Sequence, residues 1–219
     1  MSDVLGWSVA EQAQKVAQLL PDGAYVNLGI GMPSAVAAQV RPEQRIVFLC
    51  ENGLIGYREL GADESADGDI IDAASRPVGL IEGAAVVAHD VSFAIARGGR
   101  LDATILGAFQ VSQEGDLANW HAPGARVPAI GGAMDLATGA KAVIVMMKHL
   151  GRDGSHKILT QCDYPLTAIK QVGIIVTELA VIRVFGGRLV VDELAPGVSP
   201  DLLSERTGAP LDFSVLSVR

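Results

Sequence analysis

Glu51 stands where a buried strand is expected to end. It follows the apolar run at residues 46–49 and precedes Asn52 and Gly53, a pair that favours a tight turn. A carboxylate in this position can be a solvated surface charge, a ligand for a ribose hydroxyl, or a nucleophile. The third role requires partial loss of water, because a well-hydrated carboxylate attacks acyl groups poorly. Since ligands bind at the carboxyl ends of strands in open α/β sheets, Glu51 is the first candidate for chemistry.

A glycine-rich segment upstream supports the ribose-binding interpretation. The pattern Gly29-x-Gly31-x-x-Ser34 lies between an expected strand and an expected helix, and Glu51 follows about 20 residues later. In dinucleotide-binding folds such a loop holds a pyrophosphate and the acid binds a ribose hydroxyl. Two differences weaken the match, because Ser34 replaces the third glycine and Pro33 has no N–H to offer a phosphate. An NAD-binding oxidoreductase is therefore kept as a secondary alternative.

The elements that must position these residues alternate between short strands and helices. A capping box at Ser8 and Glu11 predicts a helix that ends at Pro21, and Ser199 followed by Pro200 predicts a last helix. Gly186 belongs to a turn that predicts a hairpin. A short helix is expected at residues 33–40, and an exposed, acid-rich excursion at 56–78. Strands are expected at 24–28, 45–50, 101–106, 141–147 and 173–177.

This alternation predicts an α/β fold with an open, mainly parallel central sheet and helices on both faces. The length of 219 residues fits a single domain over 1–219, and 49% hydrophobic residues predict a large core. A net charge of −8 without lysine–arginine clusters argues against nucleic acid and membrane as partners. Cys50 and Cys162 form neither a metal spacing nor a disulfide framework, so no metal site is expected and the cytoplasm is the default location.

The segment CENGLIG at residues 50–56 resembles the S-E-N-G-hydrophobic-hydrophobic-G motif of the β subunit of class I (3-oxoacid) coenzyme A transferases. The resemblance extends over nearly the whole chain, because five further blocks follow the family order. These blocks are 26–33 (VNLGIGMP), 101–111 (LDATILGAFQV), 115–120 (GDLANW), 131–136 (GGAMDL) and 207–212 (TGAPLD). Six ordered blocks are far more specific than one motif.

The resemblance implies that Glu51 is the nucleophile of a ping-pong reaction. In that cycle Glu51 attacks an acyl-CoA, forms an acyl–glutamyl anhydride and then a glutamyl–CoA thioester, and passes CoA to a second carboxylic acid. The implied substrates are an acyl-CoA such as succinyl-CoA and a 3-oxo acid. Coenzyme A is a substrate, and no cofactor is implied. An acyl-CoA hydrolase is the alternative on the same fold, because water can attack the same thioester.

The resemblance also implies roles for residues around Glu51. The Gly132 N–H would stabilise the tetrahedral oxyanion, although the Gly131-Gly132 pair alternatively only turns the chain into a helix at Ala133. Asn27 would lie near the reacting carbonyl, where its amide donates to an oxyanion or holds the Glu51 carboxylate; alternatively it only bonds within a turn. Gln110 would face the acyl group or be structural. The substrate-binding and CoA-binding candidates are Asn27, Gly29, Gly31, Asn52, Gln110, Gly131 and Ala133.

Some positions depart from the family pattern. Cys50 replaces a serine, and Ser75 replaces a lysine thought to help hold CoA, with Arg76 next to it. These departures concern the CoA contacts and the acceptor acid, and they leave the nucleophile unchanged. The resemblance covers only the β half of the family architecture. It therefore implies an α subunit as partner, in a heterodimer or heterotetramer.

Overall fold

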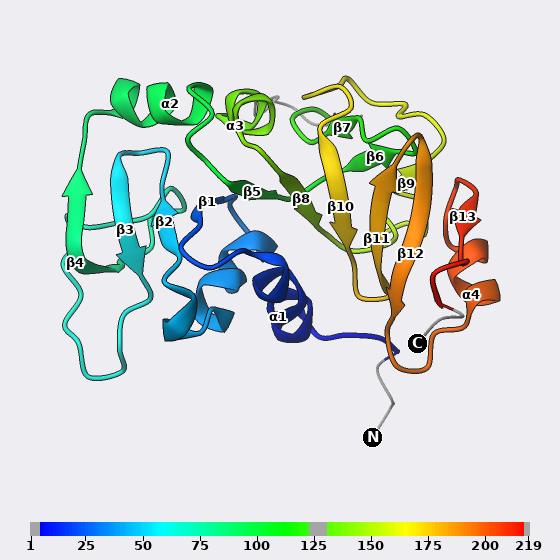
Figure 1. The fold of residues 1–219 in the computed structure, drawn as a ribbon, viewed down its shortest axis with the longest axis horizontal. Helices are drawn as coiled ribbons and strands as arrows, with labels where there is room; N and C mark the ends of the chain where they lie inside the picture. The colour runs from blue at the N-terminus through cyan, green and yellow to red at the C-terminus, as the bar shows by residue number, and fades with distance from the viewer. Residues whose placement is uncertain (1–4, 123–130, 217–219) are drawn as a thin grey trace.

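A large mixed sheet forms the centre of the molecule. The structure, a computed structural model, describes residues 5–122 and 131–216. The five central strands run parallel in the order β10-β8-β5-β1-β2 (Figure 1). Their bounds are Tyr25–Leu28 for β1, Val47–Leu49 for β2, Ala103–Leu106 for β5, Val143–Met146 for β8 and Val172–Val176 for β10. This parallel centre confirms the predicted fold class, and each strand lies within or overlaps its expected range.

Antiparallel strands extend this centre on both sides. β3 (Leu54–Arg58) and β4 (Gly79–Val86) continue the sheet beyond β2, and β11 (Ala180–Phe185) and β12 (Arg188–Leu194) continue it beyond β10. β13 (Leu211–Asp212) pairs in parallel with β12 and completes ten strands. Gly186 and Gly187, which join β11 to β12, have φ values of 59° and 71°. Two positive φ values are what a two-residue hairpin turn requires, so the predicted hairpin is confirmed.

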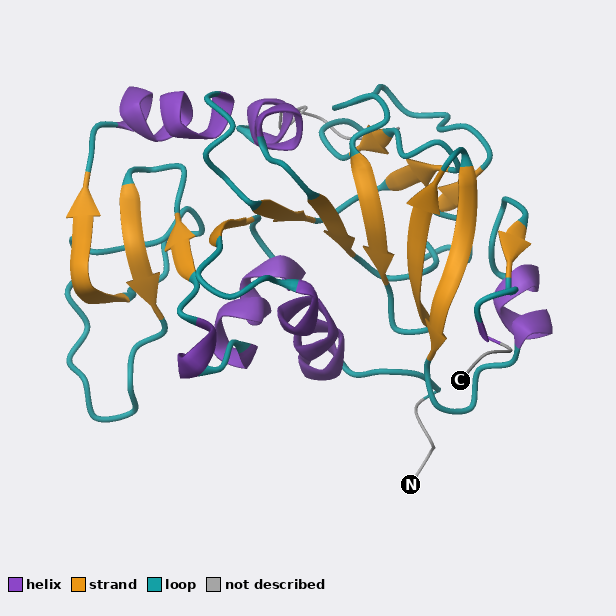
Figure 2. Ribbon diagram, viewed as in Figure 1, coloured by secondary structure: helices purple, strands orange, loops and turns teal. Residues whose placement is uncertain are grey.

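Helices cover both faces of the sheet (Figures 1 and 2). α1 (Val9–Leu19) and the 3₁₀ helix η1 (Met32–Gln39) pack together on one side, and α2 (His89–Arg97) and α3 (Ala133–Gly139) pack together on the other. The short 3₁₀ helix η2 (Pro42–Gln44) precedes β2, and α4 (Pro200–Glu205) precedes β13. No helix within residues 5–122 and 131–216 is long and apolar enough to cross a membrane.

The caps of the first and last helices follow the sequence. The Ser8 hydroxyl accepts a hydrogen bond from the Glu11 N–H, and the Glu11 carboxylate accepts one from the Ser8 N–H. This reciprocal pair is the predicted capping box. Ser199 caps α4 by accepting from the Leu202 N–H at 3.2 Å. Both predicted helix starts are therefore confirmed.

Three local features differ from the expectations. The helix expected from Pro33 is the 3₁₀ helix η1, since no side chain caps its first turn and the Ser34 hydroxyl bonds back to the Gly31 carbonyl at 2.7 Å. The acid-rich excursion begins only after Arg58, because β3 occupies its first residues, but residues 61–69 are exposed as expected.

A small second sheet was not foreseen. It has the order β7-β6-β9, with β6 at Gln110–Ser112, β7 at Leu117–Ala118 and β9 at Ile158–Leu159.

The core follows from the apolar runs of the central strands. All four residues of β5 and all four of β8 are buried, as is typical of parallel strands covered on both faces. Ile105, Val145 and Ile175 have almost no exposed surface. One continuous cluster of buried apolar residues runs through both sheets. This rigid centre holds the strand ends, and the loops that follow them, at fixed positions.

Candidate active site

Glu51 lies in the tight turn between β2 and β3. The Gly53 N–H donates to the Cys50 carbonyl at 3.0 Å, and the Cys50 N–H donates to the Leu54 carbonyl at 2.7 Å. Gly53 has a φ of 116°, and a Cβ at this position would lie 2.1 Å from the Val87 carbonyl oxygen. Only glycine fits both conditions. The Asn52-Gly53 turn therefore places Glu51 at the carboxyl edge of the outermost parallel strand.

The Glu51 side chain is partly removed from water. Burial raises the pKa of its carboxyl group, and the charge of His89 opposes this shift. Within the described residues, no hydrogen bond or ion pair involves the Glu51 carboxylate. A carboxylate that is half-buried and lacks donors retains more nucleophilicity than a hydrated one. This environment excludes the interpretation of Glu51 as a fully solvated surface charge.

Helix α2 forms the support behind the turn. The Ser92 hydroxyl donates to the Cys50 carbonyl at 3.2 Å, next to Glu51 in the chain. The Phe93 ring lies 4.8 Å from the His89 ring, measured between centroids. Helix α2 was not among the expected elements. Its signal was present, because the apolar spacing at 89–97 is helical and two glycines follow.

Gly132 lies against the Glu51 carboxylate. A Cβ placed on Gly132 would lie 3.0 Å from Glu51 Oε2 and 2.7 Å from Phe93 Cζ. Gly131 before it has a φ of 51°, and α3 begins at Ala133. The glycine pair turns the chain into a helix, as its structural interpretation expects, and it also brings peptide backbone close to the Glu51 carboxylate. The oxyanion role of the Gly132 N–H stays a prediction.

A cavity of about 330 Å³ opens beside Glu51. Five of the nine predicted site residues line it: Gly29, Glu51, Gly131, Gly132 and Ala133. They come from the loops after β1 and β2 and from the start of α3, which the fold brings to the same edge of the sheet. The assignment of their chemical roles stays a prediction.

The loop after β1 reaches this cavity through a close backbone approach. The Gly29 N–H donates to the Ile105 carbonyl at 2.8 Å, and a Cβ on Gly29 would lie 3.0 Å from the same oxygen. Gly31, with a φ of 90°, precedes η1 and does not line the cavity. Because an α-helix does not follow this loop, the pyrophosphate site of a dinucleotide fold is missing. The oxidoreductase alternative is not favoured.

Two predicted asparagines are engaged elsewhere. Asn27 is buried in β1, where its amide donates to the Leu49 carbonyl at 3.1 Å and accepts from the Thr104 hydroxyl at 3.1 Å. It therefore joins three neighbouring strands. Asn52 is exposed and donates to the Ile71 carbonyl at 2.8 Å. Neither side chain lines the Glu51 cavity.

Gln110 lies in a second, adjacent cavity. Its amide oxygen accepts from the N–H groups of Asp163 and Tyr164, at 2.8 and 3.1 Å. These bonds hold the loop after β9 against β6, which matches the structural alternative for Gln110. A role of its amide toward an acyl group stays a prediction.

The structure adds residues that the sequence did not single out. Gly107 and Phe109, from the loop after β5, line the Glu51 cavity together with Asn119. The Asn119 amide donates to the Gly107 carbonyl at 3.0 Å and so fixes this loop. Phe109 is 42% exposed, which is unusual for a phenylalanine at a cavity wall. The GDLANW block, which contains Asn119, was the available signal.

The positions that depart from the family pattern form one structural unit. The Arg76 guanidinium donates to Asp72 Oδ2 from two nitrogens, at 2.9 and 2.6 Å. Ser75 adopts a φ of 61° and is absent from the cavity wall. The buried Cys50 sulfur accepts from the Ala73 N–H at 2.9 Å, and burial raises the pKa of its thiol. The structural interpretation of Cys50 fits this contact.

Comparisons with known proteins agree with this geometry. Residues 9–206 match the coenzyme A transferase family. The chain is 48% identical over 207 residues to one of the subunits of 3-oxoadipate CoA-transferase from Pseudomonas putida, covering 93% of this chain and 96% of the relative. It is 45% identical over 203 residues to the beta subunit of acetate CoA-transferase from Escherichia coli, covering 93% and 92%.

A solved structure supports the same fold. An acyl-CoA transferase from Escherichia coli O157:H7, determined as a thioester complex with CoA, superposes with a TM-score of 0.77 at 19% identity. The match covers 99% of this chain and spans 43% of the other chain. Taken with the family match over most of the sequence, these findings show that the chain belongs to the coenzyme A transferase family.

Proposed function

We propose that this chain is the β subunit of a 3-oxoacid CoA-transferase, which moves CoA between an acyl-CoA such as succinyl-CoA and a 3-oxo acid. The observation that carries the proposal is the position of Glu51. Its carboxylate is half-buried and lies beside the Gly132 backbone at the wall of a cavity. The names of the relatives, which include a 3-oxoadipate CoA-transferase, support the substrate class.

The proposed cycle exchanges one activated acyl bond for another. A Glu51 oxygen attacks the thioester carbonyl, the C–S bond breaks, and CoA leaves as a thiolate from an acyl–glutamyl anhydride. The thiolate then attacks the glutamyl carbonyl and releases the first carboxylate, which leaves a glutamyl–CoA thioester. The acceptor carboxylate attacks this thioester, the C–S bond breaks, and CoA leaves again as a thiolate from a second anhydride. The thiolate attacks the acceptor's carbonyl, so the new acyl-CoA forms and Glu51 is free again.

The local environment suits these steps. Each attack forms a tetrahedral oxyanion, and one preorganised N–H donor at such a site is worth about 2.7–4 kcal/mol. The Gly132 N–H is the candidate donor, because its glycine backbone approaches Glu51 without an intervening Cβ. Partial burial favours attack by the carboxylate and limits competition by water. The proposal assigns no cofactor, and coenzyme A acts as a substrate.

The proposal includes an α subunit as partner. The relatives are named as single subunits of their enzymes, and this supports a separate second subunit in this protein. Ile30 and Phe109, at the Glu51 cavity, are 62% and 42% exposed. Apolar side chains at the entrance of a reaction site that must exclude water fit coverage by another chain. In isolation, the β chain is therefore expected to be inactive.

Covalent labelling tests the proposal. The chain, mixed with its α subunit, is incubated with succinyl-CoA without an acceptor acid, then digested and mapped by mass spectrometry. We expect the mass of CoA on the peptide that contains Glu51, and no such mass in Glu51→Gln. Free CoA that accumulates without an acceptor would instead identify a hydrolase. A wild-type complex that turns over substrate without a label at Glu51 would refute the mechanism.

A further inference from the structure

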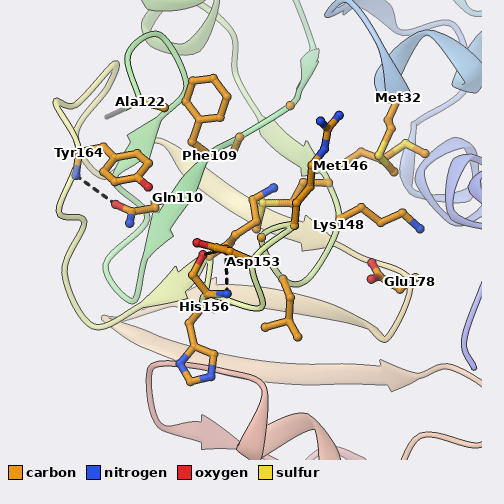
Figure 3. A pocket seen from close by; sticks show the side chains of 18 of the residues that line it. Met32, Phe109, Gln110, Ala122, Met146, Lys148, Asp153, His156, Tyr164 and Glu178 are labelled. Atoms are coloured by element: carbon orange, nitrogen blue, oxygen red, sulfur yellow. Dashed lines mark hydrogen bonds between the residues drawn. The ribbon is translucent and has the colours of Figure 1, made fainter. Parts of the chain in front are cut away.

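A second cavity lies beside the Glu51 cavity and is larger, with a volume of about 790 Å³ (Figure 3). The two cavities share four residues in their walls: Ile30, Gly107, Ala108 and Phe109. The larger one continues along the carboxyl edge of the sheet, past the ends of β8 and β10. A substrate with its reactive carbonyl at Glu51 can therefore extend into this second space.

Basic side chains gather in the wall of the larger cavity. Lys148, Arg152 and Lys157 line it, and none of them forms an ion pair within 4.0 Å in the part of the chain that the structure describes. By contrast, most of the other lysines and arginines in this part pair with an acid. The protein as a whole carries a net charge of −8, so three cations without an ion-pair partner at one cavity differ from this overall negative charge.

The acids of the same wall are already engaged by the protein. Asp153 Oδ1 accepts hydrogen bonds from the Ser155 N–H and hydroxyl, at 3.1 and 2.6 Å. Glu178 Oε2 accepts from the His149 N–H at 2.9 Å. In Figure 3, Lys148 and Glu178 lie on the same side of the cavity and His156 points away from it. One oxygen of each acid is therefore bonded within the protein, whereas Lys148, Arg152 and Lys157 have no ion-pair partner among the described residues.

Lys157 is the cation that burial affects most. Burial lowers the pKa of its ammonium group to about 8, and the charge of Glu178 opposes this shift. A partly dehydrated cation without a direct counter-ion is energetically unfavourable, and an anionic ligand would offset the loss of water. Charge-assisted hydrogen bonds from lysine and arginine are the usual means of binding carboxylate and phosphate oxygens.

We infer that this larger cavity binds an anionic group of the substrate that reacts at Glu51, with Lys157 as its main ligand and Lys148 and Arg152 beside it. The inference rests on the proposed function for the identity of the substrate. Two parts of such a substrate carry oxyanions: the distal carboxylate of a dicarboxylic acyl group, and the phosphates of CoA. Both present the same chemistry to a lysine, so the experiment separates them.

Removal of the Lys157 charge tests the inference. Lys157→Met keeps the apolar stem, and Lys157→Arg keeps the charge as a check on folding. In the complex with the α subunit, we expect kcat/KM for succinyl-CoA to fall about tenfold in Lys157→Met, the value of one charge-assisted hydrogen bond. Lys170→Met, which removes an exposed lysine paired with Glu114, is the matched control and is expected to have no effect.

Substrate variation identifies the anionic group. If Lys157 binds the acyl carboxylate, Lys157→Met leaves acetyl-CoA turnover unchanged. If it binds a CoA phosphate, succinyl-CoA and acetyl-CoA are affected alike, whereas succinyl-pantetheine is not. Changes below twofold for all three substrates, or an equal loss in Lys170→Met, would overturn the inference.

A binding measurement keeps this test separate from the reaction at Glu51. Calorimetry with CoA and with succinate, on Glu51→Gln complexes with and without Lys157→Met, reports the cavity without chemistry. Weaker binding of CoA or succinate in the double variant supports the anion site even if no thioester forms at Glu51. Equal binding of both ligands in the two complexes would refute the anion site while leaving the proposed transferase reaction intact.

Discussion

A methyl group at Gly132 should disturb the reaction site with little effect elsewhere. The added Cβ of Gly132→Ala would lie 2.7 Å from Phe93 Cζ, 2.9 Å from Phe93 Cε1 and 3.0 Å from Glu51 Oε2. Gly132 itself has a φ of −92°, which alanine adopts without strain. The expected effect is therefore steric, between this backbone and the two side chains, rather than conformational.

The contact distances set the magnitude. Carbon atoms pack at about 3.5–4.0 Å, so relief of a 2.7 Å contact requires a shift of about 1 Å in Gly132, Phe93 or both. A misplacement of about 1 Å at a reaction site costs on the order of 10²-fold in rate. A shift of Gly132 would displace its backbone relative to Glu51, and a shift of Phe93 would disturb the packing beside the carboxylate. We therefore expect kcat to fall roughly 10²-fold, with a smaller change in KM.

Steady-state transferase kinetics with the α subunit measure this effect. Gly173→Ala in β10 is the matched control, because its new Cβ would meet only the Val143 carbonyl oxygen, at 3.9 Å. Thermal unfolding of both variants reports whether each one folds. The reasoning would be refuted by a folded Gly132→Ala protein whose kcat stays within threefold of the wild type.

Three further expectations concern the turn, the nucleophile and a buried histidine. Gly53→Ala should lower the free energy of unfolding by at least about 2 kcal/mol in urea titrations, because its Cβ meets the Val87 carbonyl at 2.1 Å and φ is 116°; an unchanged midpoint would contradict this. Glu51→Gln should reduce kcat on the order of 10⁴-fold while the protein stays folded, and substantial remaining turnover would exclude Glu51 as nucleophile. Burial lowers the pKa of His149 from 6.5 to about 4. Because the folded pKa is the lower one, its contribution to stability is complete above pH 6.5. About 3 kcal/mol of that contribution should be lost between pH 6.5 and about 4. Denaturant titrations at several pH values should show this slope in the wild type but not in His149→Asn.

Local sequence signals determined much of the framework. The central strands were predictable because parallel strands covered on both faces need continuous apolar runs, as in Val143–Met146. The tight turn at Asn52-Gly53 was predictable because glycine tolerates a φ of 116°. The capping box at Ser8 was equally local, since its two hydrogen bonds join residues three positions apart. Glu51 itself stood out through its motif.

The surroundings of Glu51 depended on the tertiary structure. Gly132 reaches the Glu51 carboxylate only because the order of the strands brings the start of α3 beside the β2–β3 turn, across a long separation in sequence. α2 supplies Phe93 and Ser92 to the same place, although its residues belong to none of the motif blocks.

The polar residues near the motif show the same division. Asn27 and Asn52 have types and positions that suit substrate binding, but their amides donate to backbone carbonyls of Leu49 and Ile71. The spacing of a motif determines which side chains lie near the site. Their hydrogen-bond partners depend on the packing, because packing decides which backbone groups from distant parts of the sequence come close enough to bond. The sequence by itself thus determined the candidate nucleophile, Glu51, and the strands that carry it, and the three-dimensional fold decided what surrounds that residue.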